Sequence, residues 1–153
     1  MSNAILHSSQ YQNYRRIHLI VIHCSATRAT QRYTVDDCRR DHRARGFADI
    51  GYHYYIRKDG TVQEGRPLNQ IGAHAKGYNT GSIGICYEGG LDANRKPKDT
   101  RTEAQKKSML VLLKATLKLY PTITRICGHR DLPKVAKDCP CFDAENEYKH
   151  LLV

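Results

Sequence analysis

The stretch that decides the fold is IHLIVIH, residues 17–23. It is short, mostly apolar and rich in β-branched side chains, a pattern typical of a strand that is buried on both faces of a sheet. Two further runs have the same character, SIGICYE at residues 82–88 and ITRIC at residues 123–127. Together the three runs predict the buried strands of one central sheet.

Two helical segments lie between these strands. Thr34 and Asp37 have the spacing of a capping box, which predicts a helix over residues 34–45 that ends at Gly46. A second helix is predicted from residue 102 to about residue 120, where a capping-box pair of Thr and Gln precedes a wide apolar face and a proline follows the last turn.

A hairpin completes the set of expected elements. Residues 52–66 hold two strand-like runs joined by Asp59-Gly60, a pair that favours a type I′ turn. Strands that alternate with two helices, together with one hairpin, predict a single α/β domain with a mixed central sheet flanked by helices. We expect residues 1–16 to be an N-terminal arm and residues 17–153 to be the catalytic domain.

Length and composition agree with one globular domain. The chain has 153 residues, of which 40% are hydrophobic and 26% are charged, and a domain of this size can bury a substantial core. No apolar run approaches the length of about 18 residues that a membrane helix needs, so membrane insertion is not expected. The first twenty residues lack the apolar centre of a signal peptide, so we expect synthesis in the cytoplasm without a leader.

The chain is basic, with 25 Lys and Arg against 15 Asp and Glu and a formal net charge of +10. Such a charge favours a polyanionic partner: nucleic acid, an anionic membrane or an anionic cell-wall polymer. The basic residues are spread along the chain, and it has only two Phe and no Trp. Because no nucleic-acid motif accompanies the charge, no nucleic-acid partner is predicted.

The six cysteines form no Cys-x-x-Cys pair, which argues against a zinc ribbon or a thioredoxin-type redox site. Cys24, Cys86 and Cys127 fall inside apolar strand-like runs and are expected to be small buried side chains. With no leader expected, this usage indicates reduced thiols.

Three possible metal ligands follow the predicted strands. His23 ends the first strand, His129 follows the last strand by two residues, and Cys139 lies in the next loop. Two imidazoles and a thiolate match a catalytic zinc site, which takes three protein ligands and leaves a fourth position open. Spacing alone leaves two questions open: each histidine could be an ordinary surface residue, and Cys141 competes with Cys139 because only a proline separates them.

Four blocks carry a resemblance to a known family. They are IVIHCSAT (20–27), GYHYYIRKDGTVQEGR (51–66), GAHAKGYNTGSIGICYEGG (72–90) and GHRDLPKVAKDCPCFD (128–143). In this order they resemble the type-2 N-acetylmuramoyl-L-alanine amidases, and most of all the branch of bacteriophage T7 lysozyme. The broader superfamily includes the peptidoglycan recognition proteins. The resemblance implies the α/β fold of that superfamily.

The resemblance also implies a set of zinc ligands. His23 in HCSAT and His129 in GHRD match the two histidine ligands of the family. Cys139 matches the third ligand because the proline that follows it fits the family pattern, which leaves Cys141 as a structural thiol.

Two catalytic residues are implied in the same way. Tyr52 in GYHY matches the catalytic tyrosine of the family, with a role in binding the attacking water, binding the oxyanion or relaying a proton. Lys137 matches the catalytic lysine of the phage branch and would place positive charge at the oxyanion. The loop after His129 is slightly longer than in the phage lysozyme and also contains Lys134, but Lys137 keeps the spacing to Cys139.

A further group is implied in substrate binding. His74 lies in a glycine-rich loop of the kind that lines the substrate groove in similar proteins, and Asn79 and Ser82 belong to the same block. For Asn79 and Ser82, capping of the loop before the next strand is an equal alternative. His42 and His53 are expected to be structural.

The implied activity is zinc-dependent hydrolysis of the amide that joins N-acetylmuramic acid to L-Ala of the peptidoglycan stem. The chain would then be a bacteriolytic, endolysin-like hydrolase of phage or prophage type that degrades the cell wall and relies on another factor to reach it. Peptidoglycan is the expected partner, and a monomer is the default. The alternatives are a non-catalytic peptidoglycan-binding module of the same fold and a Cys–His hydrolase that uses Cys24 or Cys139 as nucleophile.

Overall fold

The structure, a computed structural model, describes residues 15–152. Most of the predicted N-terminal arm, residues 1–14, therefore lies outside the described residues. Arg15 is fixed against the domain, because its guanidinium donates to the main-chain carbonyls of Leu68 at 3.0 Å and Ser82 at 3.1 Å.

One five-stranded sheet runs through the molecule, in the order β4-β3-β5-β1-β7. Only β4 is antiparallel to its neighbour, so the predicted mixed sheet is confirmed. The elements in chain order are β1 (Leu19–Cys24), β2 (Thr27–Arg28), α1 (Val35–Ala44), β3 (Tyr54–Ile56), β4 (Val62–Glu64), β5 (Ser82–Tyr87), β6 (Gly90–Leu91), α2 (Glu103–Leu119), β7 (Arg125–Gly128), the 3₁₀ turn η3 (His129–Asp131), α3 (Ala144–Tyr148) and the 3₁₀ turn η4 (Lys149–Leu151).

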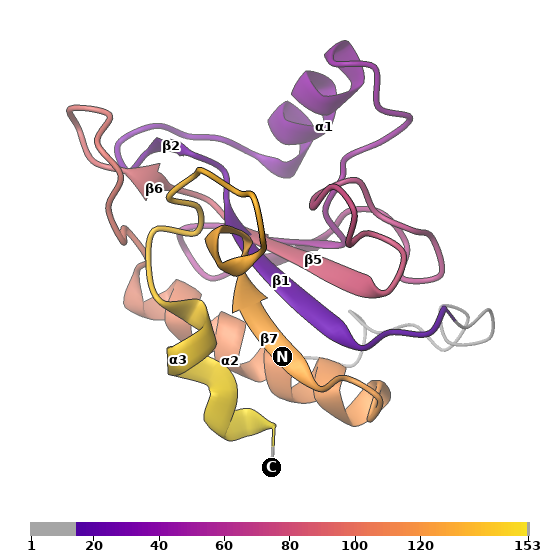
Figure 1. The fold of residues 1–153 in the computed structure, drawn as a ribbon. Coiled ribbons are helices and arrows are strands. Elements are labelled where there is room, and N and C mark those ends of the chain that lie inside the picture. Colours follow the sequence, from indigo (N-terminus) through magenta and orange to yellow (C-terminus); the bar gives the residue numbers. More distant parts are fainter. Residues whose placement is uncertain (1–14, 153) are drawn as a thin grey trace.

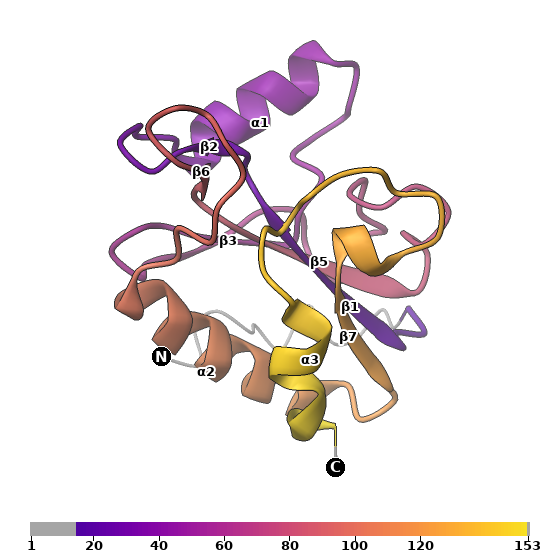
Figure 2. The ribbon, with the colours of Figure 1, turned by 60° about the vertical axis from the view of Figure 1, so that its left-hand side comes forward.

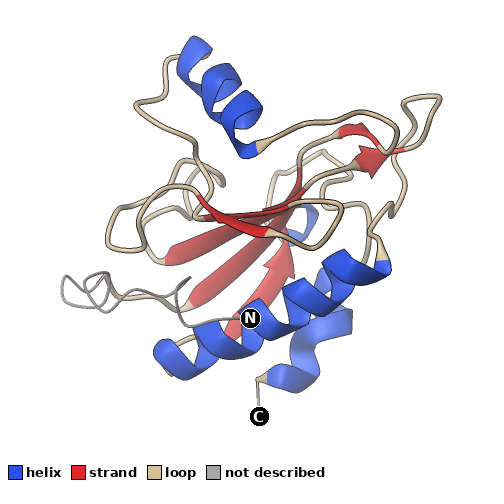
Figure 3. Ribbon diagram, turned by 180° about the vertical axis from the view of Figure 1, so that it is seen from behind, coloured by secondary structure: helices blue, strands red, loops and turns tan. Residues whose placement is uncertain are grey.

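Helices cover the sheet from both sides. In Figures 1 and 3, α2 and α3 lie below the sheet and α1 lies above it. The alternation of side chains along β1 separates the two faces. Ile20 and Ile22 belong to the core cluster that contains residues of α2, whereas Leu19 and Val21 belong to a second cluster. His23 continues the second set, so its side chain emerges on the α1 face at the carboxyl end of the central strand.

Both capping boxes form as predicted. The Thr34 hydroxyl accepts from the Asp37 N–H at 3.0 Å, and the Asp37 carboxylate accepts from the Thr34 N–H at 2.8 Å. Thr102 and Gln105 make the same reciprocal pair at the start of α2. The Gln105 amide also donates to the main-chain carbonyl of Glu88 at 3.0 Å, which docks the first turn of α2 onto the sheet.

The hairpin between β3 and β4 has a different turn from the one predicted. A type I′ turn needs two central residues with positive φ. Here Gly60 has φ +90° while Asp59 does not share this conformation. The N–H of Gly60 bonds the Arg57 carbonyl, and the N–H of Arg57 bonds the Thr61 carbonyl, each at 2.8 Å. This is a type I turn followed by a left-handed glycine. The Asp59 carboxylate stabilises it by accepting from the Thr61 N–H at 2.9 Å.

The segment beyond Cys141 is more ordered than the sequence indicated. The Asp143 side chain accepts from the N–H of Asn146 and caps the short helix α3, which lies beside α2 (Figure 2). The Arg101 guanidinium pairs with Asp99 and Glu147 and lies 3.4 Å above the centre of the Phe142 ring. These contacts tie the chain after Cys139 to the start of α2. No helix among residues 15–152 is long and apolar enough to cross a membrane.

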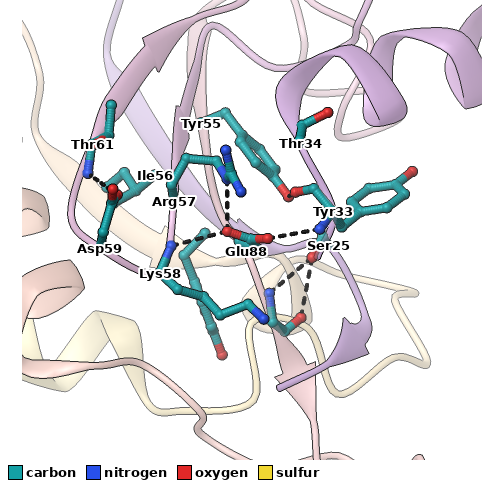
Figure 4. A network of polar contacts seen from close by, with 12 residues as sticks. Ser25, Tyr33, Thr34, Tyr55, Ile56, Arg57, Lys58, Asp59, Thr61 and Glu88 are labelled. Atoms are coloured by element: carbon teal, nitrogen blue, oxygen red, sulfur yellow. Dashed lines mark hydrogen bonds and ion pairs between the residues drawn. The ribbon is translucent and has the colours of Figure 1, made fainter. Parts of the chain in front are cut away.

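A buried carboxylate organises the loop above β5 (Figure 4). The Glu88 side chain has no exposed surface. Its Oε1 accepts from Arg57 Nε at 2.8 Å and from the Lys58 N–H at 3.0 Å, and its Oε2 accepts from the Tyr33 N–H at 2.7 Å. The Tyr55 hydroxyl donates to the Tyr33 carbonyl at 2.6 Å. Tyr33 is thereby held against the sheet.

Neutralising this carboxylate is expected to destabilise the fold. Burial by itself raises the pKa of Glu88, but the bonds from Arg57, Tyr33 and Lys58 outweigh it, so the pKa lies below the ordinary value. A depressed pKa stabilises the fold above the unfolded pKa of about 4.3, and this stabilisation is lost as pH falls through the folded pKa. Glu88→Gln should therefore lower the free energy of unfolding at pH 7 by about 1–3 kcal/mol. This free energy should then fall less in acid than it does in the wild-type protein.

Denaturant unfolding at pH 7 and in acid measures both effects. Glu103→Gln is the matched control, because that side chain is 89% exposed and its one ion pair, to Lys106, spans 3.4 Å. Equal unfolding free energies for the two variants at pH 7 would contradict the role given to Glu88.

Candidate metal centre and active site

Adjacent parallel strands bring the two predicted histidine ligands together. Ile22 of β1 is paired in register with Gly128 of β7, so His23 and His129 are the next residues along neighbouring strands. Their ring centroids lie 4.7 Å apart. The loop after His129 returns Cys139 to the same place, and one ligand atom from each of the three residues lies within 4.8 Å of the others. The structure therefore assembles the predicted set at the carboxyl edge of the sheet.

The loop that carries Cys139 is anchored to the sheet. The Cys139 sulfur accepts from the main-chain N–H of Cys24 at 3.2 Å, and the Tyr87 hydroxyl donates to the Pro140 carbonyl at 2.6 Å. Cys141 instead directs its sulfur toward Cys24 Sγ, 3.9 Å away. Of the two competing cysteines, the structure places Cys139 with the histidines.

The electrostatics of this cluster favour metal-binding protonation states. Hydrogen bonding from Cys24 lowers the pKa of the Cys139 thiol and outweighs the opposing effect of burial. Burial lowers the pKa of His23 strongly, and burial followed by the charge of Lys137 lowers the pKa of His129. A thiolate and two neutral imidazoles are the forms that bind zinc, and each of these shifts is toward such a form.

The donor set also fits zinc in geometry. Donor atoms bound tetrahedrally at about 2.0 Å for nitrogen and about 2.3 Å for sulfur lie roughly 3.3–3.6 Å apart. The Cys139 sulfur is 3.9 Å from His23 Nδ1. Small side-chain adjustments would bring the set to bonding distance. Nitrogen and sulfur donors favour zinc over magnesium or calcium, which prefer oxygen ligands.

A cleft of about 880 Å³ opens above the three residues. Its walls come from residues 33–47 around α1, from the loop at residues 73–79 and from residues 134–137. The charged side chains in the wall are mostly basic; they are Arg45, Lys76, Lys134 and Lys137, against the single acidic residue Asp41. Asp41 accepts a hydrogen bond from the Tyr33 hydroxyl at 2.6 Å. The cleft therefore suits an anionic ligand.

Tyr52 stands beside the metal candidates. It lies shortly before β3, lines the cleft, and has its ring centroid 5.0 Å from that of His23 and 5.3 Å from that of His42. The N–H of Gly51 donates to His42 Nδ1 at 2.8 Å, which docks α1 next to the tyrosine. Burial raises the pKa of Tyr52 well above its usual value, so the phenol keeps its proton at neutral pH.

Both lysines of the 134–137 segment line the cleft and are exposed to solvent. The charge of Lys137 lowers the pKa of both His23 and His129. Lys134 has a left-handed backbone conformation, with φ +64°. The catalytic role of Lys137 remains a prediction.

The three residues predicted to bind substrate form one hydrogen-bonded group. His74 Nδ1 lies 2.8 Å from His23 Nε2, and His74 Nε2 lies 3.1 Å from the Ser82 hydroxyl. The Asn79 side chain accepts from the main-chain N–H of His74 at 2.9 Å. His74 and Asn79 line the cleft, whereas Ser82 is fully buried and lies outside its walls. The substrate-binding role of the three residues remains a prediction.

The contact between His74 and the predicted ligand His23 was not predicted from the sequence. A signal for it was present in Gly84, a glycine inside a predicted strand, which often marks a close approach. A Cβ at Gly84 would lie within 2.6 Å of the His74 ring, so the glycine makes room for that ring.

The cysteines outside the cluster are poorly placed for thiol catalysis. Cys38 Sγ lies 3.7 Å from His42 Nε2, but His42 Nδ1 accepts from Gly51, so the neutral ring carries its proton on the nitrogen that faces the thiol. Burial raises the pKa of Cys38 to about 12, and hydrogen bonding with Cys139 raises the pKa of Cys24 to about 12. His42 and His53 are both buried, as expected of structural histidines.

Comparisons with known proteins agree with this arrangement. Residues 13–142 match the profile of a family described as N-acetylmuramoyl-L-alanine amidase. The endolysins of Klebsiella phage KP32 and Escherichia phage T7 are each 40% identical over 134 residues, a match that covers 88% of this chain and 87% of each relative. Among solved structures, the N-acetylmuramoyl-L-alanine amidase LysC from Clostridium intestinale has a TM-score of 0.74 and 33% identity, covering 88% of this chain and 83% of that chain.

Proposed function

The chain belongs to the N-acetylmuramoyl-L-alanine amidase family, and on that premise we propose that it hydrolyses, with zinc as cofactor, the amide between N-acetylmuramic acid and L-Ala of the peptidoglycan stem. One observation carries the proposal above all. Two imidazoles and a thiolate from distant parts of the chain, His23, His129 and Cys139, converge within 4.8 Å of one another beneath a basic cleft.

The three ligands would hold the ion through the histidine nitrogens and the Cys139 sulfur. A bound zinc ion supplies a Lewis acid that polarises a carbonyl and lowers the pKa of a water molecule, which provides a nucleophile at neutral pH. The main-chain N–H of Cys24 stabilises the thiolate form of Cys139, since it donates to the sulfur at 3.2 Å.

Lys137 and Tyr52 would act on the reacting amide. When a nucleophile adds to the amide carbon, negative charge develops transiently on the carbonyl oxygen, and a positive charge held near it lowers the barrier. Lys137 lines the cleft close enough to the ligands to shift the pKa of His129. Tyr52 keeps its proton, so its hydroxyl would donate a hydrogen bond to the same oxygen. His74 and Asn79, which also line the cleft, are predicted to contact the substrate.

The charge of the protein suits the proposed substrate. Peptidoglycan stems and the associated wall polymers carry carboxylates and phosphates, so a net charge of +10 would concentrate the enzyme at the wall. Relatives described as endolysins support a role in degrading the bacterial wall. We propose that a separate export or lysis factor brings the enzyme to the wall. We propose that the enzyme acts as a monomer.

A digest of purified peptidoglycan tests the bond and the cofactor together. The zinc-loaded protein should release stem peptides that begin at L-Ala and leave intact glycan chains, as read by mass spectrometry. A chelator-stripped sample should release none, and zinc should restore the release. Cuts within the glycan or within the stem would contradict the proposed bond, and an intact wall with zinc-loaded protein would favour a non-catalytic peptidoglycan-binding module.

A further inference from the structure

The two ring nitrogens of His23 face different partners. Nδ1 lies 3.9 Å from the sulfur of Cys139, another of the predicted ligands. Nε2 lies 2.8 Å from Nδ1 of His74. Of the two nitrogens, Nδ1 is therefore the one directed toward the metal position, and Nε2 is already taken by a protein partner.

The His74 ring is fixed where it stands. Its Nε2 lies 3.1 Å from the hydroxyl of Ser82, which is fully buried at the start of β5. Asn79 accepts from its main-chain N–H at 2.9 Å. Gly84 packs closely against the His74 ring, since a Cβ there would lie within 2.6 Å of the ring. Both ring nitrogens of His74 therefore have partners within the protein.

We infer that His74 is a positioning residue of the metal centre, which, supported by Ser82, fixes His23 as an Nδ1 ligand. The inference rests on the proposed zinc site. A neutral imidazole that binds metal through Nδ1 carries its proton on Nε2. At 2.8 Å from His74, that proton can only be donated to an unprotonated His74 Nδ1.

The direction of the hydrogen bond between His74 and Ser82 follows from the direction of the one between His23 and His74. A neutral His74 that accepts on Nδ1 carries its own proton on Nε2, so it donates to the Ser82 hydroxyl. Hydrogen bonds of this kind, from the outer nitrogen of a ligand histidine, fix the tautomer and the orientation of the ring, and their removal typically weakens metal binding by about 10–100-fold. In most metal sites the acceptor is a carboxylate, a carbonyl or water. Here it is a second histidine.

Histidine NMR on the wild-type protein tests the tautomer directly. In ¹⁵N-labelled, zinc-loaded protein, long-range ¹H–¹⁵N spectra should show metal binding at His23 Nδ1 and a proton on His23 Nε2. The same spectra should show His74 with its proton on Nε2. A proton on His23 Nδ1 in the zinc-loaded protein would overturn the inference.

Zinc affinity, measured by competition with a chromophoric chelator, tests the same contact. His74→Leu removes the acceptor and should weaken zinc binding about 10–100-fold. His74→Asn keeps a hydrogen-bonding oxygen near the position of Nδ1 and should stay within about threefold of wild type. His42→Leu is the matched control, because it removes a buried histidine of the same face that contacts Tyr52 and no predicted ligand.

Equal affinities for His74→Leu and wild type, or equal losses for His74→Leu and His42→Leu, would each overturn the inference. If His74→Leu does not fold in the metal-free state, Ser82→Ala takes its place and should weaken binding in the same direction. Neither measurement uses peptidoglycan. A protein that shows the Nδ1 pattern but releases no stem peptides would refute the proposed function alone, and an active enzyme with His23 bound through Nε2 would refute this inference alone.

Discussion

Cys139→Ser is expected to reduce the release of stem peptides by at least about three orders of magnitude. A serine hydroxyl does not ionise at neutral pH, so the variant loses the thiolate that the proposed site needs. A bound metal lowers the activation barrier by several kcal/mol, and each 1.36 kcal/mol corresponds to a tenfold change in rate. The zinc content of the purified protein should fall together with the rate, while the metal-free fold should persist, because Cys139 is only a partly buried residue.

Cys141→Ser is the matched control for this result. Cys141 lies two residues further on, is also partly buried, and directs its sulfur to Cys24 rather than to the histidines. We expect Cys141→Ser to retain zinc and to stay within a few-fold of wild-type activity, as is usual for a substitution outside the proposed active site. If Cys141→Ser lost zinc and activity while Cys139→Ser kept them, the assignment of the third ligand would be wrong.

Lys137→Met should lower kcat by about 10²–10³-fold, the range found when a single oxyanion-stabilising group is removed. The methylene stem is largely retained, so the change removes mainly the charge. Because the charge acts on the transition state more than on the bound substrate, KM should change much less than kcat. Steady-state rates on solubilised peptidoglycan, with zinc content checked for each variant, measure the two constants separately.

Lys134→Met separates this effect from the general attraction of a basic cleft. Both lysines are exposed and line the cleft, and the charge of Lys137 lowers the pKa of both His23 and His129. We expect Lys134→Met to change kcat by no more than about threefold, as for an ordinary surface substitution. Comparable losses from the two substitutions would mean that the cleft uses its net charge and that neither lysine has a specific role.

Short sequence patterns were sufficient to predict most of the helices and strands. The capping boxes at Thr34 and Thr102 form as predicted, because each depends only on residues three positions apart. The buried strands followed from apolar runs whose character does not depend on their partners. The mixed sheet followed in turn, since strands separated by helices pair in parallel and the hairpin pairs antiparallel.

Elements that depend on distant partners were either not predicted or predicted incorrectly. The Asp59-Gly60 turn adopts another type, and the adjoining Lys58 N–H is bonded to Glu88, a residue thirty positions away. The helix α3 has only five residues, too short to be stable alone, and is held by Arg101 through Glu147. The two-residue pairing of β2 with β6 likewise exists only because the chain brings those segments together.

The sequence by itself determined the fold class, the family and the identity of the candidate ligands, because strand character, caps and ordered motif blocks are properties of contiguous residues. The resemblance already favoured Cys139 over Cys141 and Lys137 over Lys134. Only the tertiary structure showed where the two cysteine sulfurs point and what His74 contacts. Cys139 and Cys141 are two residues apart, and so differ little in sequence, yet one sulfur faces His23 and the other Cys24. Side-chain direction is set by packing between distant segments, and it is that direction which decides coordination and hydrogen bonding.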